Sequence, residues 1–364
     1  MKILVATGAS GGHIFPALSF LETLKEKHEE IETLLVLPKR SIRNQVIPQN
    51  LRVKYLPIST IRKSFNLRNF IAIFDFLKGS FESLFLLAEF RPDVVVGFGS
   101  LNSIPVLLGG WIFRTGTLIH EQNVIPGRAN RLLAKFIDKI AVSFPETKDY
   151  LKTDPKRVVV TGNPLRKELK MVEKKEALRF FGLSENKLTI LTMGGSQGSH
   201  SININFLKAI SDFPDKSKLQ IIHIAGSSDY DLLEKGYRDS GLSYRLFHFL
   251  KEMQYAYSAC DFAISRAGAT TIAELMNFSV PAIMVPYPFA YAHQLGNAKV
   301  LGNLGSAIVI GDEKLDSAEF KRILIGLINN PEKIKELRSS YANAPKLDAN
   351  ELLVREALRL VLNE

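Results

Sequence analysis

Short apolar runs alternate with helical patterns along most of the chain, and this alternation predicts an α/β fold. An apolar run at residues 2–7 is followed by a glycine loop at residues 8–13 and a helix from about residue 16 to residue 27. The same strand, glycine loop and helix are repeated at residues 188–193, 194–198 and about 202–210. Because this opening occurs twice, we expect two α/β domains of similar build.

Further strands are predicted where β-branched residues cluster between helical segments. They fall at residues 33–37, 94–97, 117–121, 139–142 and 158–161, and then at 220–225, 244–247, 262–265, 282–285 and 307–310. Strands separated by helices indicate parallel sheets with right-handed crossovers.

A change of domain is expected near residues 161–166, where Gly162 and Pro164 interrupt the pattern. We therefore assign residues 1–163 to the first domain and residues 164–342 to the second. Residues 343–364 contain an amphipathic helix that we expect to return to the first domain. A plain terminal helix on the second domain is the alternative.

The segment 65–90 is rich in phenylalanine and predicts an amphipathic helix. Positions 70, 73, 74, 77, 81, 84, 85 and 88 share one face at helical period, and we assign that face to the core. Phe65, Phe76 and Leu87 recur every eleven residues on another face, with basic residues nearby. That second face suits insertion into an anionic membrane leaflet, although a helix packed on two sides would give the same pattern.

Composition narrows the class of protein. The 364 residues fit two domains, and 46% hydrophobic with 23% charged residues is typical of a folded protein. The net charge of +10 is spread along the chain without a basic block, so phosphate-bearing partners or an anionic membrane are favoured over nucleic acid.

No protein-bound metal and no cofactor are expected. One cysteine, Cys260, and seven scattered histidines offer no metal-ligand spacing. Asp229-Tyr-Asp231 imitates a metal-binding DxD motif, but it precedes a predicted helix, where capping explains it better. A lone thiol, a first strand without a basic leader and a glycine-broken uncharged run at 94–113 together favour a cytoplasmic protein.

The two glycine loops are the first features that indicate chemistry. Glycines followed by a helix N-terminus can cradle an oxygen-rich anion or a sugar. The first loop contains Ser10, Gly11, Gly12 and His13, without the Lys-Ser/Thr of a Walker loop or the Gly-x-Gly-x-x-Gly order of a dinucleotide loop. A Rossmann oxidoreductase is therefore disfavoured.

Polar clusters follow several other predicted strands. Glu274 lies about one turn into a helix that follows Ser265 and Gly268, where it can accept from a ribose diol or simply suit the helix dipole; spacing alone leaves both readings open. The remaining clusters are His120-Glu-Gln-Asn123, Thr161-Gly-Asn-Pro-Leu-Arg166 and Ala292-His-Gln-Leu-Gly-Asn297. Ligands of open α/β sheets bind at the carboxyl ends of strands, so these clusters indicate one binding region in each domain.

In this order, from residue 3 to about residue 310, the motifs resemble the MurG family of bacterial cell-wall transferases, in glycosyltransferase family 28. The resemblance implies the GT-B fold, with two Rossmann-like doubly wound domains facing across a cleft. It also implies an inverting transfer of GlcNAc from UDP-GlcNAc to the C4 hydroxyl of MurNAc in undecaprenyl-pyrophosphoryl-MurNAc-pentapeptide (lipid I), which yields lipid II for peptidoglycan synthesis.

Two alternatives stay open beside this reading. A related GT-B enzyme could glycosylate another lipid acceptor, such as diacylglycerol. A non-catalytic nucleotide-sugar binder or membrane scaffold is disfavoured, because Ser10, His13, Ser196, Glu274 and Gln294 are all retained.

The resemblance also implies residue roles. His13 would be the general base, with Glu121 as the second catalytic residue and Ser10 and Asn123 on the acceptor and sugar side. Arg166 and Ser196 would hold the donor diphosphate, and Glu274 would bind the ribose. Leu250 and Met253 would lie at the uracil, and Ala269 and Gln294 would bind the sugar hydroxyls. The remaining donor contacts would be Gly11, Gly12, Gln197, His293 and Asn297.

The same resemblance implies a location and partners. A lipid-linked acceptor places the protein peripherally on the cytoplasmic face of the bacterial inner membrane, on an anionic surface. Its partners would be UDP-GlcNAc, lipid I and other cell-wall synthesis proteins, and its activity would serve cell shape and cell division.

Overall fold

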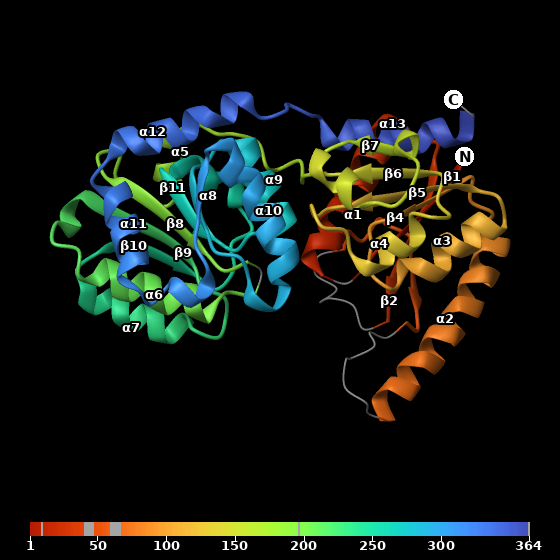
Figure 1. Cartoon of the computed structure of the whole chain (residues 1–364), viewed down its shortest axis with the longest axis horizontal. Coiled ribbons are helices and arrows are strands. Elements are labelled where there is room, and N and C mark those ends of the chain that lie inside the picture. The colour runs from red at the N-terminus through yellow and green to blue at the C-terminus, as the bar shows by residue number, and fades with distance from the viewer. Residues whose placement is uncertain (9, 40–46, 59–66, 196, 363–364) are drawn as a thin grey trace. The chain divides into compact units, whose positions relative to one another are not determined.

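The chain folds into two compact units in a computed structural model that describes residues 1–8, 10–39, 47–58, 67–195 and 197–362 (Figure 1). Unit 1 comprises Met1–Arg166 and Leu347–Glu364, and unit 2 comprises Lys167–Lys346. The chain therefore passes between the units twice, after Arg166 and after Lys346. Among the described residues, no helix combines the length and apolarity that crossing a membrane requires.

Unit 1 contains, in its described part, a sheet of seven strands in the order β3-β2-β1-β4-β5-β6-β7, and every pairing is parallel. The strands are β1 (Lys2–Ala6), β2 (Glu32–Pro38), β3 (Val53–Leu56), β4 (Val94–Gly97), β5 (Gly116–Glu121), β6 (Lys139–Val142) and β7 (Val158–Val160). The predicted parallel α/β sheet is thus confirmed. Sequence patterns missed β3, an edge strand whose Lys54 and Tyr55 are exposed.

Helices cover both faces of this sheet. They are α1 (Gly11–Lys27), α2 (Leu67–Phe90), α3 (Ser103–Ile112), α4 (Arg128–Leu133) and α13 (Ala349–Leu362). Helices α1 and α13 share one face, where Leu353 and Ala357 of α13 are buried in the same core as Phe20 and Leu24 of α1. Helices α2, α3 and α4 contribute to the core on the other face.

Helix α2 faces the core with a different side from the predicted one. Gly79, Ser83 and Leu87 are buried, whereas Ile73, Phe74, Leu77, Phe81 and Phe85 are 49–75% exposed. The predicted core face is therefore wrong at these five positions and at Ala88, which is also exposed, while the side chain of Phe70 lies outside the described ones. The physical reason is close packing: a Cβ on Gly79 would lie 2.4 Å from Ile58, so small side chains occupy the inner side.

The burial of α2 also bears on the three residues expected to enter the membrane, Phe65, Phe76 and Leu87. Leu87 is 3% exposed, so it cannot insert into a leaflet as predicted. Phe76 is half-buried against the core, and its insertion stays a prediction. Phe65 lies outside the described residues.

Unit 2 repeats the architecture with six parallel strands in its described part, in the order β10-β9-β8-β11-β12-β13. The strands are β8 (Leu188–Met193), β9 (Leu219–Ile224), β10 (Ser243–Phe247), β11 (Phe262–Ser265), β12 (Ala282–Met284) and β13 (Ala307–Val309). The helices are α5 (Lys174–Phe180), α6 (His200–Ser211), α7 (Tyr230–Ser240), α8 (Met253–Ala259), α9 (Ala269–Phe278), α10 (Tyr291–Leu304), α11 (Ala318–Ile328) and α12 (Pro331–Ser339).

Each sheet has one point where the strand order reverses. In unit 1 it lies between β1 and β4, and in unit 2 between β8 and β11. The loops that leave these strands diverge to opposite faces, which opens a crevice at the carboxyl ends of the strands. His13 follows β1, and Arg266 directly follows β11, so each unit places a distinctive side chain at its own switch point.

Candidate functional site

The loop after β1 delivers His13 in the first turn of α1. The helix begins at Gly11, earlier than predicted, because the carbonyl oxygen of Ser10 already accepts from the backbone N–H groups of His13 and Ile14 at 3.0 Å. Ser10 is exposed and its hydroxyl makes no capping bond. A Cβ on Gly12 would meet no atom within 4 Å, so this helix N-terminus is accessible from that side.

The imidazole of His13 is held between two glycines. A Cβ on Gly8 or on Gly99 would lie 3.2 Å from a carbon of the ring. Gly99 and Ser100, with φ of 82° and 73°, form a left-handed turn after β4 that brings the backbone against the ring. His13 is half-buried as a result.

Behind His13 lies a buried amide. The Nδ1 atom of His13 is 3.0 Å from Oε1 of Gln122, which is 1% exposed. The Nε2 atom of Gln122 lies 3.1 Å from Nδ1 of His120, and Nε2 of His120 lies 2.9 Å from the carbonyl oxygen of Gly162. Burial lowers the pKa of His120 to about 4, against the raising effect of the Gly162 hydrogen bond, with a smaller lowering by His13.

Glu121 has a different environment from the one its predicted role requires. It ends β5, is 2% exposed, and its carboxylate accepts from the backbone N–H groups of Asn123 and Gly127 at 2.9 and 3.0 Å. The side-chain amides of Asn123 and Asn130 donate to the same carboxylate at 3.2 and 2.8 Å. Glu121 thus shapes the loop after β5, and its catalytic role stays a prediction.

Arg166 is the last residue of the first segment of unit 1. Its guanidinium lies over the ring of Phe15 in α1, 5.2 Å from the ring centroid. This cation–π contact attaches Arg166 to the helix that carries His13. Its contact with the donor diphosphate stays a prediction.

The second glycine loop, after β8, packs backbone against backbone. A Cβ on Gly198 would lie 2.0 Å from the carbonyl oxygen of Ala225, and one on Gly226 would lie 2.4 Å from that of Gln197. Gln197 is exposed, and Ser196 lies outside the described residues. Gly198, with a φ of 79°, therefore leaves no room for a side chain where the loop leads into α6.

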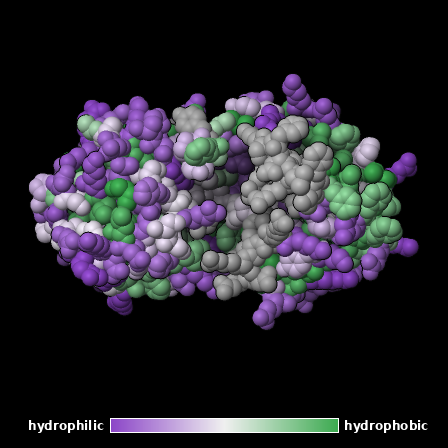
Figure 2. Space-filling model, turned by 90° about the horizontal axis from the view of Figure 1, so that it is seen from below, coloured by the Kyte–Doolittle hydropathy of each residue, from purple (hydrophilic) through white to green (hydrophobic). Residues whose placement is uncertain are grey.

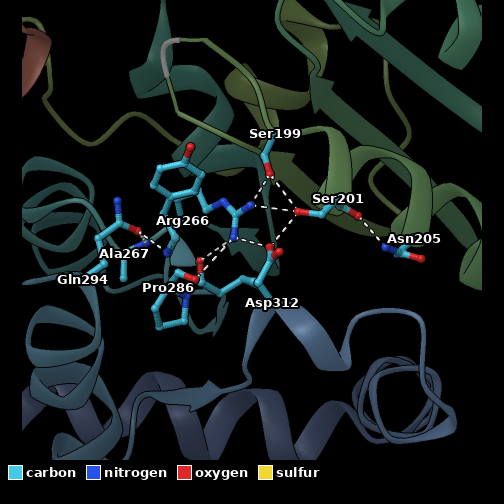
Figure 3. A network of polar contacts seen from close by, with 10 residues as sticks. Ser199, Ser201, Asn205, Arg266, Ala267, Pro286, Gln294 and Asp312 are labelled. Atoms are coloured by element: carbon cyan, nitrogen blue, oxygen red, sulfur yellow. Dashed lines mark hydrogen bonds and ion pairs between the residues drawn. The ribbon is translucent and has the colours of Figure 1, made fainter. Parts of the chain in front are cut away.

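A buried arginine braces this loop from below (Figure 3). Arg266 donates to the hydroxyls of Ser199 and Ser201 at 2.7 and 2.8 Å and pairs with the carboxylate of Asp312 at 2.5 Å. Ser201 donates to the same carboxylate at 2.6 Å. Arg266 also donates to the carbonyl of Val285 at 3.3 Å, so one guanidinium ties the start of α6 to the loops after β12 and β13.

Gln294 and Asn297 of α10 hold the loop after β11. Oε1 of Gln294 accepts from the backbone N–H group of Ala267 at 3.1 Å (Figure 3). The same oxygen accepts from the backbone N–H of Tyr287 at 2.9 Å, and Asn297 donates to the carbonyl of Ala267 at 3.1 Å. The carbonyl end of Gln294 is thus committed to the backbone, which leaves its –NH₂ group as the end that can donate to a ligand.

The remaining predicted donor residues also lie in unit 2. Leu250, Met253 and Ala269 are each less than 10% exposed, and Met253 and Ala269 begin α8 and α9. Glu274, 9% exposed, accepts from the hydroxyl of Tyr257 at 2.6 Å. His293 is half-buried in α10, beside Gln294.

Within the residues that the structure describes, no group of three His, Cys, Asp or Glu side chains could hold a metal ion. Asp229 does precede a helix, α7, as predicted, but its carboxylate makes no capping bond. It accepts instead from His200 and Asn203, each at 2.8 Å. The capping explanation for Asp229 is therefore wrong.

Sequence reasoning missed the residues that stand behind the predicted ones. Gln122 lies inside the cluster His120-Glu-Gln-Asn123 and Arg266 directly follows Ser265, but the sequence predicts no role for either, nor for Asp312 and Tyr257. A charged or amide side chain at the end of an apolar strand was the available signal for the first two. Asp312 and Tyr257 meet their partners only through the tertiary fold.

Comparisons with known proteins agree in both halves of the chain. Residues 3–142 match the Glycosyltransferase family 28 N-terminal domain, and residues 189–353 match the Glycosyltransferase family 28 C-terminal domain. A relative from Halothermothrix orenii, named UDP-N-acetylglucosamine--N-acetylmuramyl-(pentapeptide) pyrophosphoryl-undecaprenol N-acetylglucosamine transferase, is 35% identical over 363 residues, 97% of each chain. One of the same name from Thermodesulfovibrio yellowstonii is 34% identical over 99% of each chain.

A solved structure is similar along its whole length. The crystal structure of Acinetobacter baumannii MurG matches with a TM-score of 0.78 and 25% identity, covering 99% of this chain and 100% of that one. The similarity extends over both Rossmann-like sheets.

Proposed function

The chain belongs to glycosyltransferase family 28, and we propose that it transfers GlcNAc from UDP-GlcNAc to the C4 hydroxyl of MurNAc in lipid I, which forms lipid II. The observation that carries this proposal is the 35% identity, over 97% of both chains, to a relative named for that transfer. The predicted GT-B fold, with two Rossmann-like units, supports it.

In the proposed reaction, His13 removes the proton from the acceptor hydroxyl as its oxygen attacks the anomeric carbon. The bond between that carbon and the UDP oxygen breaks on the opposite face, and UDP leaves with the bonding electrons. The configuration inverts, and a β-1,4 link forms. A positioned general base contributes typically ~10²–10⁴-fold to such a step.

The donor would be held by unit 2. The glycine loop before α6, braced by Arg266, offers backbone N–H groups and a helix N-terminus to the diphosphate. Glu274, oriented by Tyr257, accepts from the ribose hydroxyls. Gln294 donates from its –NH₂ group to a sugar hydroxyl, and Leu250 and Met253 lie at the uracil.

Purified protein incubated with labelled UDP-GlcNAc and lipid I tests the proposal. We expect a GlcNAc–MurNAc lipid product with lipid I and none with diacylglycerol, the alternative acceptor. UDP-glucose and UDP-GalNAc in place of UDP-GlcNAc should give much less product, and NADH should cause no melting shift. Transfer to diacylglycerol alone would replace the acceptor, and a preference for NADH would overturn the function.

We also propose that unit 1 docks on an anionic membrane through an exposed apolar surface. This surface, the α2 face, consists of Ile73, Phe74, Leu77, Phe81 and Phe85. Apolar side chains gather on the part of the molecule that contains α2, at the right of Figure 2.

The neighbouring helices of the same layer support this docking. Trp111, Ile112 and Phe113 at the end of α3 are 46–60% exposed, and Trp111 contacts the ring of Phe136 after α4. Exposed basic side chains accompany them: Lys78, Arg114, Arg131 and Lys135. Apolar area with cationic neighbours is the combination that binds an anionic leaflet.

Cosedimentation with vesicles of phosphatidylcholine, with and without phosphatidylglycerol, tests the docking. The variant Phe74→Ser/Phe81→Ser/Phe85→Ser should lose most binding to the anionic vesicles and keep its melting temperature. Leu232→Ser on α7 of unit 2, at an apolar residue that is also more than half exposed, should bind as the parent does. Equal binding by both variants would contradict the proposed surface.

A peripheral position on the cytoplasmic face of the inner membrane follows from this proposal, because the acceptor is lipid-linked. Other cell-wall synthesis proteins would then be its neighbours there. Fractionation of cells with and without high salt would separate a peripheral protein from a soluble one.

A further inference from the structure

The buried amide of Gln122 has only one orientation that its surroundings permit. Its Nε2 atom lies 3.3 Å from the carbonyl oxygen of Phe98 and 3.1 Å from that of His120. Carbonyl oxygens only accept hydrogen bonds, so the –NH₂ group must face them. The opposite orientation would place Oε1 against two other oxygens in a buried site. Oε1 therefore faces His13.

This orientation decides which nitrogen of His13 carries the proton. Because Oε1 of Gln122 only accepts, Nδ1 of His13, at 3.0 Å, must donate to it. In the neutral ring the lone pair then resides on Nε2, the nitrogen that a base would use. We propose that Gln122 is a positioning residue that fixes the reactive tautomer of His13.

The same logic extends one residue further. Nε2 of Gln122 also lies 3.1 Å from Nδ1 of His120, and Nε2 of His120 is 2.9 Å from the carbonyl oxygen of Gly162. Nε2 of His120 must therefore donate to that carbonyl, and Nδ1 of His120 accepts. His13 and His120 are held in opposite tautomers by the one amide between them. His120 is fully buried and remains neutral, so its Nε2 continues to donate and its Nδ1 continues to accept.

Gly162 anchors the far end of this chain of hydrogen bonds. Its φ is +81°, and a Cβ there would lie 3.1 Å from Cβ of Ala349 at the start of α13. The peptide that accepts from His120 is thus wedged against α13. The ring of His13 is consequently oriented by the backbone of unit 1, through Gln122 and His120, and not by a carboxylate.

Glu121, the neighbouring carboxylate, does not orient the ring of His13. Its two oxygens accept from Asn123, Gly127 and Asn130, and among the described residues no hydrogen bond joins it to His13. The titratable side chain that faces His13 across Gln122 is His120. A neutral partner leaves the charge of the protonated base uncompensated, whereas a carboxylate in the same place would stabilise it.

The role of His13 as base rests on the proposed function, but its tautomer does not, so the two can fail separately. We would record long-range ¹H–¹⁵N spectra of the full-length protein with ¹⁵N-labelled histidine, at a pH where the ring is neutral. His13→Gln identifies the His13 signals among the seven histidines. We expect a protonated Nδ1 and an unprotonated Nε2, and a rise of the Nε2–H tautomer in Gln122→Leu.

A wild-type His13 protonated on Nε2, or a Gln122→Leu spectrum that still shows only Nδ1–H, would overturn the proposal, whatever the enzymatic activity. A wild-type protein with the expected tautomer but without GlcNAc transfer would leave the positioning intact and remove the proposed function.

Kinetics supply a second readout that a merely structural residue would not move. Gln122→Leu removes the acceptor that holds the proton on Nδ1 of His13, so kcat should fall several-fold as the reactive tautomer becomes the minor one. The KM for UDP-GlcNAc should not change. Ser143→Ala removes another buried hydrogen bond to this loop, to the backbone of Glu121, and should leave kcat in place. An unchanged kcat in Gln122→Leu, or an equal fall in Ser143→Ala, would refute the assignment.

Discussion

The points where the strand order reverses in the two sheets have the same backbone topology, but the side chains around them form a neutral network in unit 1 and a charged one in unit 2. In unit 1, His13, Gln122 and His120 form a chain of neutral groups in which each hydrogen bond sets the next. In unit 2, Arg266 and Asp312 form a largely buried ion pair that also holds two hydroxyls at the start of α6. His13 and Arg266 each follow the carboxyl end of a central strand, β1 and β11, in sheets of matching order.

The difference indicates a division of tasks. A general base needs a free lone pair. The neutral hydrogen-bonded chain behind His13 leaves this lone pair available, because it places no negative charge nearby that would stabilise the protonated ring. A diphosphate site needs loops that keep their N–H groups aimed at a fixed place, and a buried ion pair with further hydrogen bonds holds loops firmly. We therefore expect changes in unit 1 to affect the rate of the chemical step and changes in unit 2 to affect donor binding.

The largest expected effect is that of His13→Ala. Loss of the base should lower kcat by ~10²–10⁴-fold while the dissociation constant of UDP-GlcNAc changes little. Steady-state transfer assays and calorimetric titration of the donor would measure the two quantities. An unchanged kcat would remove His13 from the base role and end the comparison.

The next effect is that of Arg266→Met, which leaves Asp312 without its counter-charge. Removing one partner of a buried pair typically costs about 3–5 kcal/mol of folding free energy, and the exposure of Asp312 places this one at the lower end. Donor affinity should fall as well, because Ser199 and Ser201 lose their common partner. Thermal unfolding by circular dichroism and calorimetric titration would measure both.

Arg266→Met/Asp312→Leu is the matched control for that variant. Without either charge, most of the lost stability should return, whereas donor affinity should not. A single variant as stable as the parent would show that the ion pair does not brace the loop.

A smaller effect concerns pH. Burial lowers the pKa of His120 from 6.5 to about 4, so the unfolded chain binds the proton more readily than the folded one. This group's contribution to stability is complete above about pH 6.5 and is lost as the pH falls toward 4, by about 3 kcal/mol. His120→Gln should reduce this loss in unit 1.

Fluorescence of Trp111, the single tryptophan, reports the unfolding of unit 1 by urea. His223 of unit 2, whose pKa burial lowers to about 3, is the comparison residue. His223→Gln should leave the pH dependence of the Trp111 signal unchanged, and an equal flattening in both variants would contradict the separate assignment.

The smallest effect is that of Tyr257→Phe, which removes one hydrogen bond to Glu274. The dissociation constant of UDP-GlcNAc should rise several-fold, equivalent to about 1 kcal/mol, with kcat unchanged. A fall in kcat with unchanged donor affinity would place Glu274 and Tyr257 on the catalytic side of the comparison.

The sequence predicts the fold well where β-branched runs end in glycine loops. The sequence predicts the start of α1 too late, because the glycines before Pro16 resemble a loop, although the carbonyl of Ser10 already accepts helical hydrogen bonds. The predicted inner side of α2 is wrong because periodicity identifies apolar stripes without saying which one meets the sheet. Gly79 and Ser83 decide that question through close packing.

The site was predictable residue by residue only where a motif carried it. His13, Glu274 and Gln294 follow strands in a recognisable order. The contacts of Gln122 and Arg266 join segments far apart in the chain, such as Gln122 with His13 and Arg266 with Asp312. Such pairs depend on the strand order of each sheet, which no local pattern contains.

The most direct test of the division between the units is the single-turnover rate of GlcNAc transfer as a function of UDP-GlcNAc concentration, measured with His13→Ala and Arg266→Lys. We predict that His13→Ala lowers the plateau and keeps the midpoint, whereas Arg266→Lys moves the midpoint to higher concentration and keeps most of the plateau. If both variants change the same parameter, the neutral and the charged networks do not serve separate tasks.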